Sequence, residues 1–151
     1  MNRRIALFLS IAIIIFALDQ LIKFSFVQGF SWESSCISLV LHYNKGVAFS
    51  MFAFLGENLK WIQLALISAL IVYIFKGGYL KSYLLPAGIL TGAALGNLLD
   101  RFVHGGVVDY IYWHCGFEFA IFNFADMMID LAIALFLLQA YILERGTAKK
   151  G

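Results

Sequence analysis

Apolar residues concentrate in four long runs along the chain, at about residues 5–26, 59–75, 83–103 and 125–143. A helix needs roughly 20 mostly apolar residues to cross the hydrocarbon core of a bilayer, and each run comes close to that length. The pattern therefore predicts four transmembrane helices.

Two of the intervening segments, at about 28–58 and 104–124, are longer and of mixed polarity. Within them, residues 37–44 (ISLVLHYN) and 117–123 (FEFAIFN) alternate in a way that favours β-strands with one apolar face. We expect an all-α membrane protein with four transmembrane helices and a small β-containing subdomain on the membrane surface. Residues 1–151 should form a single domain, because no repeat, linker or low-complexity tract divides them.

Composition supports the membrane class. Hydrophobic residues make up 62% of the chain and charged residues 13%, whereas a soluble domain has about a quarter charged residues. The first apolar run, preceded by Arg3 and Arg4, resembles a secretory signal, but no small-x-small cleavage site follows it and it leads into Asp19 and Lys23. We interpret it as a retained helix.

The positions of basic residues predict the orientation, because Lys and Arg in short loops stay on the cytoplasmic side. Both termini should be cytoplasmic and the two longer segments external. Of the nine acidic residues, only Glu144 falls on the cytoplasmic side, so any acid chemistry should face outward. Cys36 and Cys115 both fall in external segments. The sequence does not decide whether they form a disulfide or remain two free thiols. The basic residues are Arg3 and Arg4, then Lys76 and Lys81, then Arg145, Lys149 and Lys150.

Ionisable residues at membrane depth cost about 2.5–3.5 kcal/mol each at a helix centre, so their presence needs a reason. Asp19 and Lys23 lie one turn apart near the outer end of the first run, as a structural ion pair or as part of a site. In the third run Asn97, Asp100 and Arg101 share one helix face, again as a structural network or a site. Before them Gly88, Gly92 and Gly96 recur every four residues, which predicts close helix packing.

Two further carboxylates stand at the outer surface. Asp109 lies in an apolar, strand-like segment after a chain reversal at Gly105–Gly106. An isolated carboxyl group in apolar surroundings has a raised pKa. The alternative is a turn aspartate whose carboxylate accepts hydrogen bonds from backbone amides. Asp126 falls in the first turn of the fourth helix, which Asn123 could cap, and a plain helix-start aspartate is its alternative role. Asp130 shares the face of Asp126, so spacing alone does not choose between them.

Two carboxyl groups held together can share one proton, so that one activates water while the other hydrogen-bonds the substrate carbonyl. We therefore favour aspartic proteolysis by Asp109 with Asp126. The sequence lacks the two-histidine metalloprotease helix, a Walker loop and a dinucleotide fingerprint, and we expect no metal, cofactor or nucleic acid to take part. A small proton- or ion-coupled transporter is the alternative, although neither inverted repeats nor broken helices are visible. A noncatalytic assembly subunit or inactive relative is a third class.

Five blocks, in order, resemble lipoprotein signal peptidase, the signal peptidase II family, over nearly the whole chain. They are DQLIK at 19–23, NKGVAFS at 44–50, GAALGNLLDR at 92–101, GGVVDYI at 105–111 and FNFAD at 122–126.

The resemblance implies an aspartyl endopeptidase of the bacterial inner membrane. Its substrates would be prolipoproteins whose lipobox cysteine carries a diacylglyceryl group, cut just before that cysteine, and globomycin-type peptides would inhibit it. The family motifs place the catalytic pair on Asp109 and Asp126 and so decide against Asp130. Positions around the site fall on Asn44, Asn97, Asp100, Arg101 and Asn123, with supporting roles for Asp19 and Lys23.

Three residues depart from the family pattern. Met127 replaces a small polar residue, Tyr110 replaces a phenylalanine, and Asp130 is an extra acid, expected to be structural or to modulate the pair. The segment 47–54 is hypothesised to clamp the substrate from above.

Overall fold

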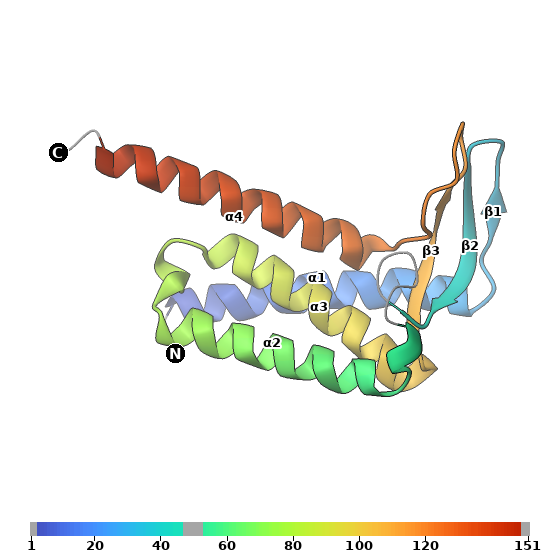
Figure 1. The fold of residues 1–151 in the computed structure, drawn as a ribbon, viewed down its shortest axis with the longest axis horizontal. Helices are drawn as coiled ribbons and strands as arrows, with labels where there is room; N and C mark the ends of the chain where they lie inside the picture. The colour runs from blue at the N-terminus through green and yellow to red at the C-terminus, as the bar shows by residue number, and fades with distance from the viewer. Residues whose placement is uncertain (1–2, 47–52, 149–151) are drawn as a thin grey trace.

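The computed structural model describes residues 3–46 and 53–148, which form four α-helices, two short 3₁₀ turns and one sheet. The helices lie side by side, with the sheet at one end and the start of α1 and end of α4 at the other (Figure 1). The helices are α1 (Arg3–Val27), α2 (Asn58–Lys76), α3 (Leu84–His104) and α4 (Phe124–Ala148); the 3₁₀ turns are η2 (Ala53–Leu55) and η3 (Tyr79–Lys81).

Three of these helices in the described part of the chain are long and apolar enough to cross a membrane, namely α1, α2 and residues Phe124–Arg145 of α4. The remaining helix, α3, is more polar and is also the most buried, with α1, α2 and α4 all packed against it. Its neighbours cover most of its polar groups, which explains why this more polar helix lies at the centre of the four.

The glycines of α3 bring it close to α1, as predicted. A methyl group at Gly92 would overlap the carbonyl oxygen of Ala12, and one at Gly96 would overlap the carboxylate of Asp19. At Gly88 it would meet the side chain of Ile11. The close approach delivers Asp19 directly to the face of α3 that carries Asn97 and Asp100.

The predicted helix bounds agree with the structure within two residues, except at the end of α4. This helix continues to Ala148, five residues past the predicted end at 143. Apolarity marks where a helix leaves the membrane, whereas its backbone hydrogen bonds continue into the polar segment. Near this end the Arg145 guanidinium lies over the Tyr141 ring, 4.6 Å from its centroid.

The sheet has three antiparallel strands in the order β1 (Trp32–Glu33), β2 (Ile37–Asn44), β3 (Val107–Trp113). The prediction of a strand at Ile37–Asn44 is confirmed. In the register of β2 with β3, Asn44 lies opposite Val107 and His42 opposite Asp109. The strand pairing therefore brings Asn44 beside the start of β3.

The predicted strand at 117–123 is wrong. Within the described chain this segment forms one isolated bridge with β3, between Ile111 and Phe122, and the Phe119 amide also donates to the Trp113 carbonyl at 3.0 Å. The amides of Tyr110 and Ile111 both donate to the Phe122 carbonyl, at 3.1 and 2.8 Å, which interrupts the ladder. The chain then turns to start α4 at Phe124, so alternation there reflects contact with β3 rather than a continuous strand.

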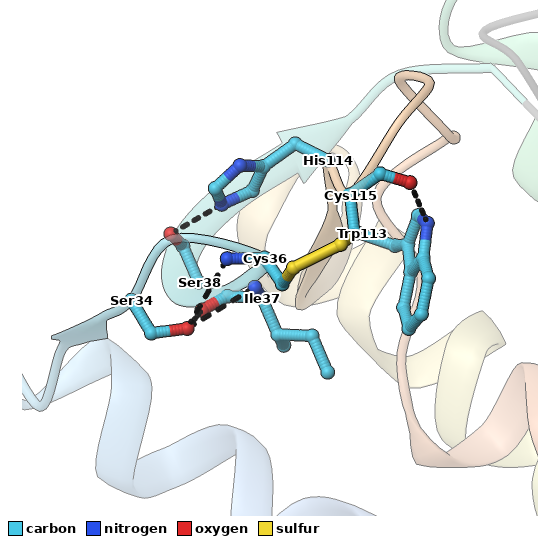
Figure 2. Close-up of a disulfide and its surroundings, with 7 residues drawn as sticks. All are labelled: Ser34, Cys36, Ile37, Ser38, Trp113, His114 and Cys115. Atoms are coloured by element: carbon cyan, nitrogen blue, oxygen red, sulfur yellow. Dashed lines mark hydrogen bonds between the residues drawn. A yellow bond between two sulfur atoms is a disulfide. The ribbon is translucent and has the colours of Figure 1, made fainter.

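The sequence left a disulfide and two free thiols open, and the structure pairs Cys36 with Cys115 (Figure 2). Beside the disulfide, the Ser38 hydroxyl lies 3.0 Å from Nε2 of His114. The bond joins Cys36, just before β2, to Cys115, two residues after the end of β3. It therefore fastens the sheet at the end of these strands that is remote from Asn44.

Candidate active site

The reversal after α3 positions Asp109. Gly105 ends the helix with a φ of 70°, a conformation that glycine adopts without strain. The Val108 amide then donates to Asp100 Oδ2 at 3.1 Å, which ties the start of β3 back to α3. Asp109 lies within β3 and is 1% exposed. The alternative of a turn aspartate satisfied by backbone amides is therefore wrong.

Asn123 and Asp126 form a reciprocal cap at the start of α4. The Asp126 amide donates to Asn123 Oδ1 at 2.9 Å, and the Asn123 amide donates to Asp126 Oδ2 at 3.1 Å. This is the arrangement of a capping box, with aspartate in place of the usual glutamate or glutamine. Asp126 is thus both a helix-start aspartate and a residue of the candidate site.

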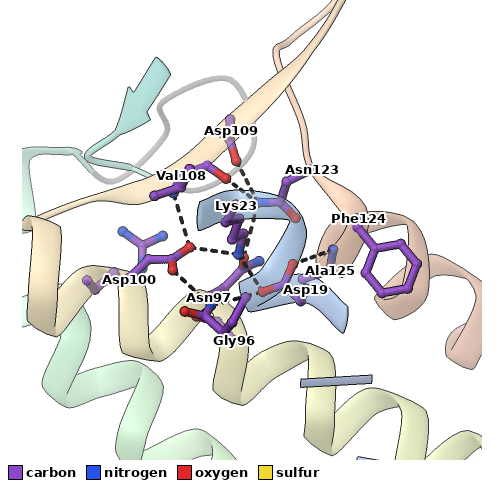
Figure 3. Close-up of polar contacts among 12 residues, drawn as sticks. Asp19, Lys23, Gly96, Asn97, Asp100, Val108, Asp109, Asn123, Phe124 and Ala125 are labelled. Atoms are coloured by element: carbon purple, nitrogen blue, oxygen red, sulfur yellow. Dashed lines mark hydrogen bonds and ion pairs between the residues drawn. The ribbon is translucent and has the colours of Figure 1, made fainter. Parts of the chain in front are cut away.

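Two asparagines connect the two carboxyl groups, and Figure 3 shows one of these links, from Asn123 to Asp109. Asn123 Nδ2 donates to Asp109 Oδ1 at 2.7 Å and also lies 3.1 Å from Asn97 Oδ1. Asn97 in turn donates through Nδ2 to Asp126 Oδ1 at 2.9 Å. From β2, Asn44 Nδ2 donates to Asp109 Oδ2 at 3.0 Å. Both carboxyl groups are therefore oriented by amide donors from α3, β2 and the segment before α4.

Lys23 joins the buried charges behind this pair. Its Nζ lies 2.8 Å from Asp19 Oδ2 and 2.7 Å from Asp100 Oδ2, and it donates to Asn97 Oδ1 at 2.8 Å. Asp19 Oδ1 accepts from the Ala125 amide at 3.2 Å, which fixes the first turn of α4 against α1. The predicted ion pair and network are both present, and they support the candidate site from behind.

Arg101 fastens the end of β2 to the helices. Its Nε donates to Gln63 Oε1 on α2 at 2.8 Å, and its Nη2 donates to the Gly46 carbonyl. Gly46 is itself held by a 2.9 Å bond from its amide to Asn44 Oδ1. The guanidinium therefore positions the residues that carry Asn44 toward Asp109.

Burial raises the pKa of Asp109 to about 7, and the Asp126 carboxylate contributes in the same direction. Hydrogen bonds from Asn44 and Asn123 and the charge of Lys23 act in the opposite direction but do not cancel these effects. Asp109 is therefore protonated below pH 7, as the sequence analysis expected of a carboxyl in an apolar strand.

A cavity of about 590 Å³ opens beside the two carboxyl groups. Asp109 and Asp126 line it together with Asn44, Asn97 and Arg101. Its remaining walls are mostly apolar and come from α2, α4 and the segment before α4: Leu59, Ile62, Gln63, Leu66, Phe119, Ala120, Ile121, Phe122, Met127 and Ile129, with Asp130 and Val107. The arrangement can hold an apolar peptide segment against two carboxyl groups, one of them protonated at neutral pH or below. Among the described residues, no group of three or more His, Cys, Asp or Glu side chains is arranged to hold a metal ion.

A family sequence model described as signal peptidase (SPase) II matches residues 11–142, most of the chain. The chain belongs to the signal peptidase II family. The lipoprotein signal peptidase of Sulfurovum sp. (strain NBC37-1) is 60% identical over 139 residues, which cover 92% of this chain and 95% of that protein. That of Wolinella succinogenes is 52% identical over 145 residues, covering 94% of this chain and 99% of that protein. A solved structure described as a bacterial membrane enzyme matches with a TM-score of 0.77 at 26% identity, over 95% of this chain and 91% of that chain.

The signal peptidase II match confirms the resemblance drawn from the five sequence blocks, and it supports signal-peptide cleavage rather than transport. The nine site residues predicted from the sequence lie in one cluster: eight are joined directly by hydrogen bonds or ion pairs, and Arg101 is connected to Asn44 through Gly46. They are Asp19, Lys23, Asn44, Asn97, Asp100, Arg101, Asp109, Asn123 and Asp126.

Sequence reasoning assigned no role in the candidate site to three residues that support it. Gln63 accepts a hydrogen bond from Arg101 and donates to the Ala94 carbonyl at 3.2 Å. The sequence feature that could have indicated its role is a single amide side chain within an apolar run. Gln20 donates to Asp100 Oδ1 at 3.0 Å. The Tyr110 hydroxyl accepts from the Phe124 amide at 3.1 Å, a contact that the phenylalanine usual in the family would not make.

Proposed function

We propose that the chain is a membrane aspartyl endopeptidase that removes the signal peptide from diacylglyceryl-modified prolipoproteins, cutting just before the lipidated cysteine. The observation that carries the proposal is the pair of carboxyl groups from β3 and α4, bridged by Asn123 at the edge of an apolar cavity. Membership of the signal peptidase II family and the names of the relatives support the same activity.

In the proposed mechanism Asp126 is the ionised member of the pair and takes a proton from a water molecule. The resulting hydroxide equivalent attacks the scissile carbonyl while protonated Asp109 donates a hydrogen bond to the carbonyl oxygen. The tetrahedral intermediate then collapses, and the proton gained by Asp126 passes to the leaving amine. Asn97 and the Asn123 amide orient Asp126, and Asn44 and Asn123 orient Asp109.

The proposed mechanism predicts that activity falls as the pH rises above 7. Asp109 must be protonated to hydrogen-bond the substrate, and its pKa is about 7, so the active fraction is largest below that pH. Above it, kcat/KM should fall about tenfold for each further pH unit, because one proton is lost. The pH profile of kcat/KM measures this; constant activity from pH 6 to pH 9 would contradict the assigned role of Asp109.

We further propose that α3 is a fourth membrane span, which completes a four-span domain over residues 1–151. Its 21 residues extend about 31 Å, close to the roughly 30 Å of the hydrocarbon core. The basic residues at the ends of the spans favour cytoplasmic termini, as predicted. The membrane would be the bacterial inner membrane, with the sheet and the two aspartates toward its outer face.

A lipid-anchored substrate suits a site at this depth. The diacylglyceryl group and the apolar signal helix both hold the scissile bond near the membrane surface, so proximity replaces extended sequence recognition. Globomycin-type peptides would compete for the apolar cavity. The proposed clamp at 47–54 falls mainly on residues 47–52, outside the described part of the chain.

The test is cleavage by the purified protein in detergent of a prolipoprotein with and without the diacylglyceryl group. We expect cleavage of the modified substrate before its cysteine, located by mass spectrometry, and little or none of the unmodified one. Failure to cleave the modified substrate under conditions where the protein is folded would refute the proposed function.

A further inference from the structure

A third carboxyl group lines the cavity, and the proposed mechanism does not use it. Asp130 lies one helical turn beyond Asp126 on α4. The other polar side chains of the lining are each hydrogen-bonded within the protein, namely Asn44, Gln63, Asn97, Arg101, Asp109 and Asp126. Within the part of the chain that the structure describes, Asp130 forms no hydrogen bond or ion pair, and its side chain is exposed to the cavity.

The surroundings of Asp130 make this position unusual. On α4 the lining beside Asp130 consists of the apolar Met127 and Ile129 and of the Asp126 carboxyl group one turn away, which interacts electrostatically with Asp130. From α2 the lining contributes the apolar Ile62 and Leu66. Gln63 is the other polar residue on that wall, but its Nε2 already donates to the Ala94 carbonyl at 3.2 Å and its Oε1 accepts from Arg101. A carboxyl group at membrane depth is costly unless it meets a donor, which points to a donor supplied by whatever fills the cavity.

The position of Asp130 relative to the scissile bond follows from helix and strand geometry. Four residues of helix place it about 6 Å deeper in the membrane than Asp126. The signal segment precedes the cleavage site and lies on the deeper side. An extended peptide advances about 3.3 Å per residue, so Asp130 falls beside substrate residues two to three positions before the scissile bond.

A substrate must lose helical structure at these positions before its peptide bond can meet the two aspartates. Its backbone N–H groups then lose their helical acceptors in a place with little water, where each unsatisfied group is expensive. A carboxyl oxygen at this depth meets that need.

We propose that Asp130 is a substrate-binding residue that accepts a hydrogen bond from a backbone N–H two or three residues before the scissile bond. This deepens the proposed peptidase function and rests on it. The recognised chemistry is the backbone of an unwound signal segment, so the contact tolerates different side chains there.

The first experiment compares the wild type with Asp130→Leu and Asp130→Asn in detergent, using a diacylglyceryl-modified lipopeptide. We expect kcat/KM to fall about tenfold or more for Asp130→Leu, because the acceptor is lost. Asp130→Asn keeps a carbonyl acceptor and should recover most of that loss. Glu33→Leu is the matched control, because it makes the same change of a carboxyl group to leucine on the exposed strand β1, outside the cavity. Thermal unfolding checks that each variant is folded.

The second experiment identifies the donor. Lipopeptides carry an ester in place of the amide at one of the residues two, three or four positions before the scissile bond, which replaces a single N–H by oxygen. We expect one ester to reduce wild-type kcat/KM about as much as Asp130→Leu does, with no further loss when the two changes are combined.

The outcomes separate the two proposals. If the wild type does not cleave the all-amide lipopeptide, the proposed function itself fails. If the wild type cleaves and Asp130→Leu cleaves equally well, only the role of Asp130 is refuted. The role of Asp130 is also refuted if the activity loss caused by Asp130→Leu multiplies with the loss caused by each of the three esters. Asp130 would then contact something other than these N–H groups.

Discussion

Asp109→Asn and Asp126→Asn should each lower kcat/KM for a diacylglyceryl-modified prolipoprotein by about 10³-fold or more. Asparagine cannot take a proton from water in place of Asp126, and it cannot share a proton in place of Asp109. Because the proposed mechanism uses the two aspartates as a unit, the double variant should be scarcely less active than either single variant.

The structure also shows why these variants should still fold. Asparagine at either position has nearly the shape of aspartate and retains one acceptor oxygen for the donors around it. Glu33→Gln is the matched control, since it makes the same acid-to-amide change on the exposed strand β1. Either aspartate variant retaining more than a tenth of wild-type activity would contradict the assignment of the pair.

Lys23→Met should destabilise the protein by about 3–5 kcal/mol, the cost of leaving buried charges without their partner. Lys23 is 2% exposed, and it is the ammonium group shared by Asp19 and Asp100, which are 0% and 1% exposed. Without it the two carboxyl groups repel each other. Because Asp19 holds the Ala125 amide and Asp100 holds the Val108 amide, activity should be lost along with stability.

Reversible unfolding in mixed micelles, followed by circular dichroism, measures this loss. Lys60→Met is the matched control, because Lys60 pairs with the exposed Glu57 on the surface and such pairs contribute under about 1 kcal/mol. Adding Asp19→Asn and Asp100→Asn to Lys23→Met should restore much of the stability by removing the unpaired charges. Equal stability of the Lys23 and Lys60 variants would show that the buried cluster does not stabilise the fold as argued.

Local pattern was sufficient to predict most of the secondary structure. The alternation of apolar and polar residues predicted the bounds of β2, and the length of the apolar runs predicted the positions of the helices. Both features depend directly on burial in a sheet or a membrane. The segment 117–123 alternates as well, but its pairing partner is determined by how β3 and the start of α4 meet. The two-residue strand β1 and the end of α4 have no comparable signal in the sequence.

The candidate site was predictable as a set of residues but not as a set of contacts. Helix spacing correctly grouped Asn97 with Asp100, and capping preference correctly placed Asn123 before α4. The family motifs, and not spacing, selected Asp126 over Asp130. Contacts between distant segments, such as Gln63 with Arg101, depend on tertiary packing that no local pattern encodes.

The bond between Asp19 and the Ala125 amide joins residues 106 positions apart in the sequence. Asn44 comes from the first third of the chain and Asp126 from its last quarter, so the proposed catalytic centre is complete only late in biosynthesis. A nascent chain that ends before α4 lacks one carboxyl group, the asparagine that bridges the pair and the helix cap. If the proposed pair is the catalytic one, proteolytic activity arises only when the final helix docks, and a partly synthesised chain does not cut its neighbours during membrane insertion.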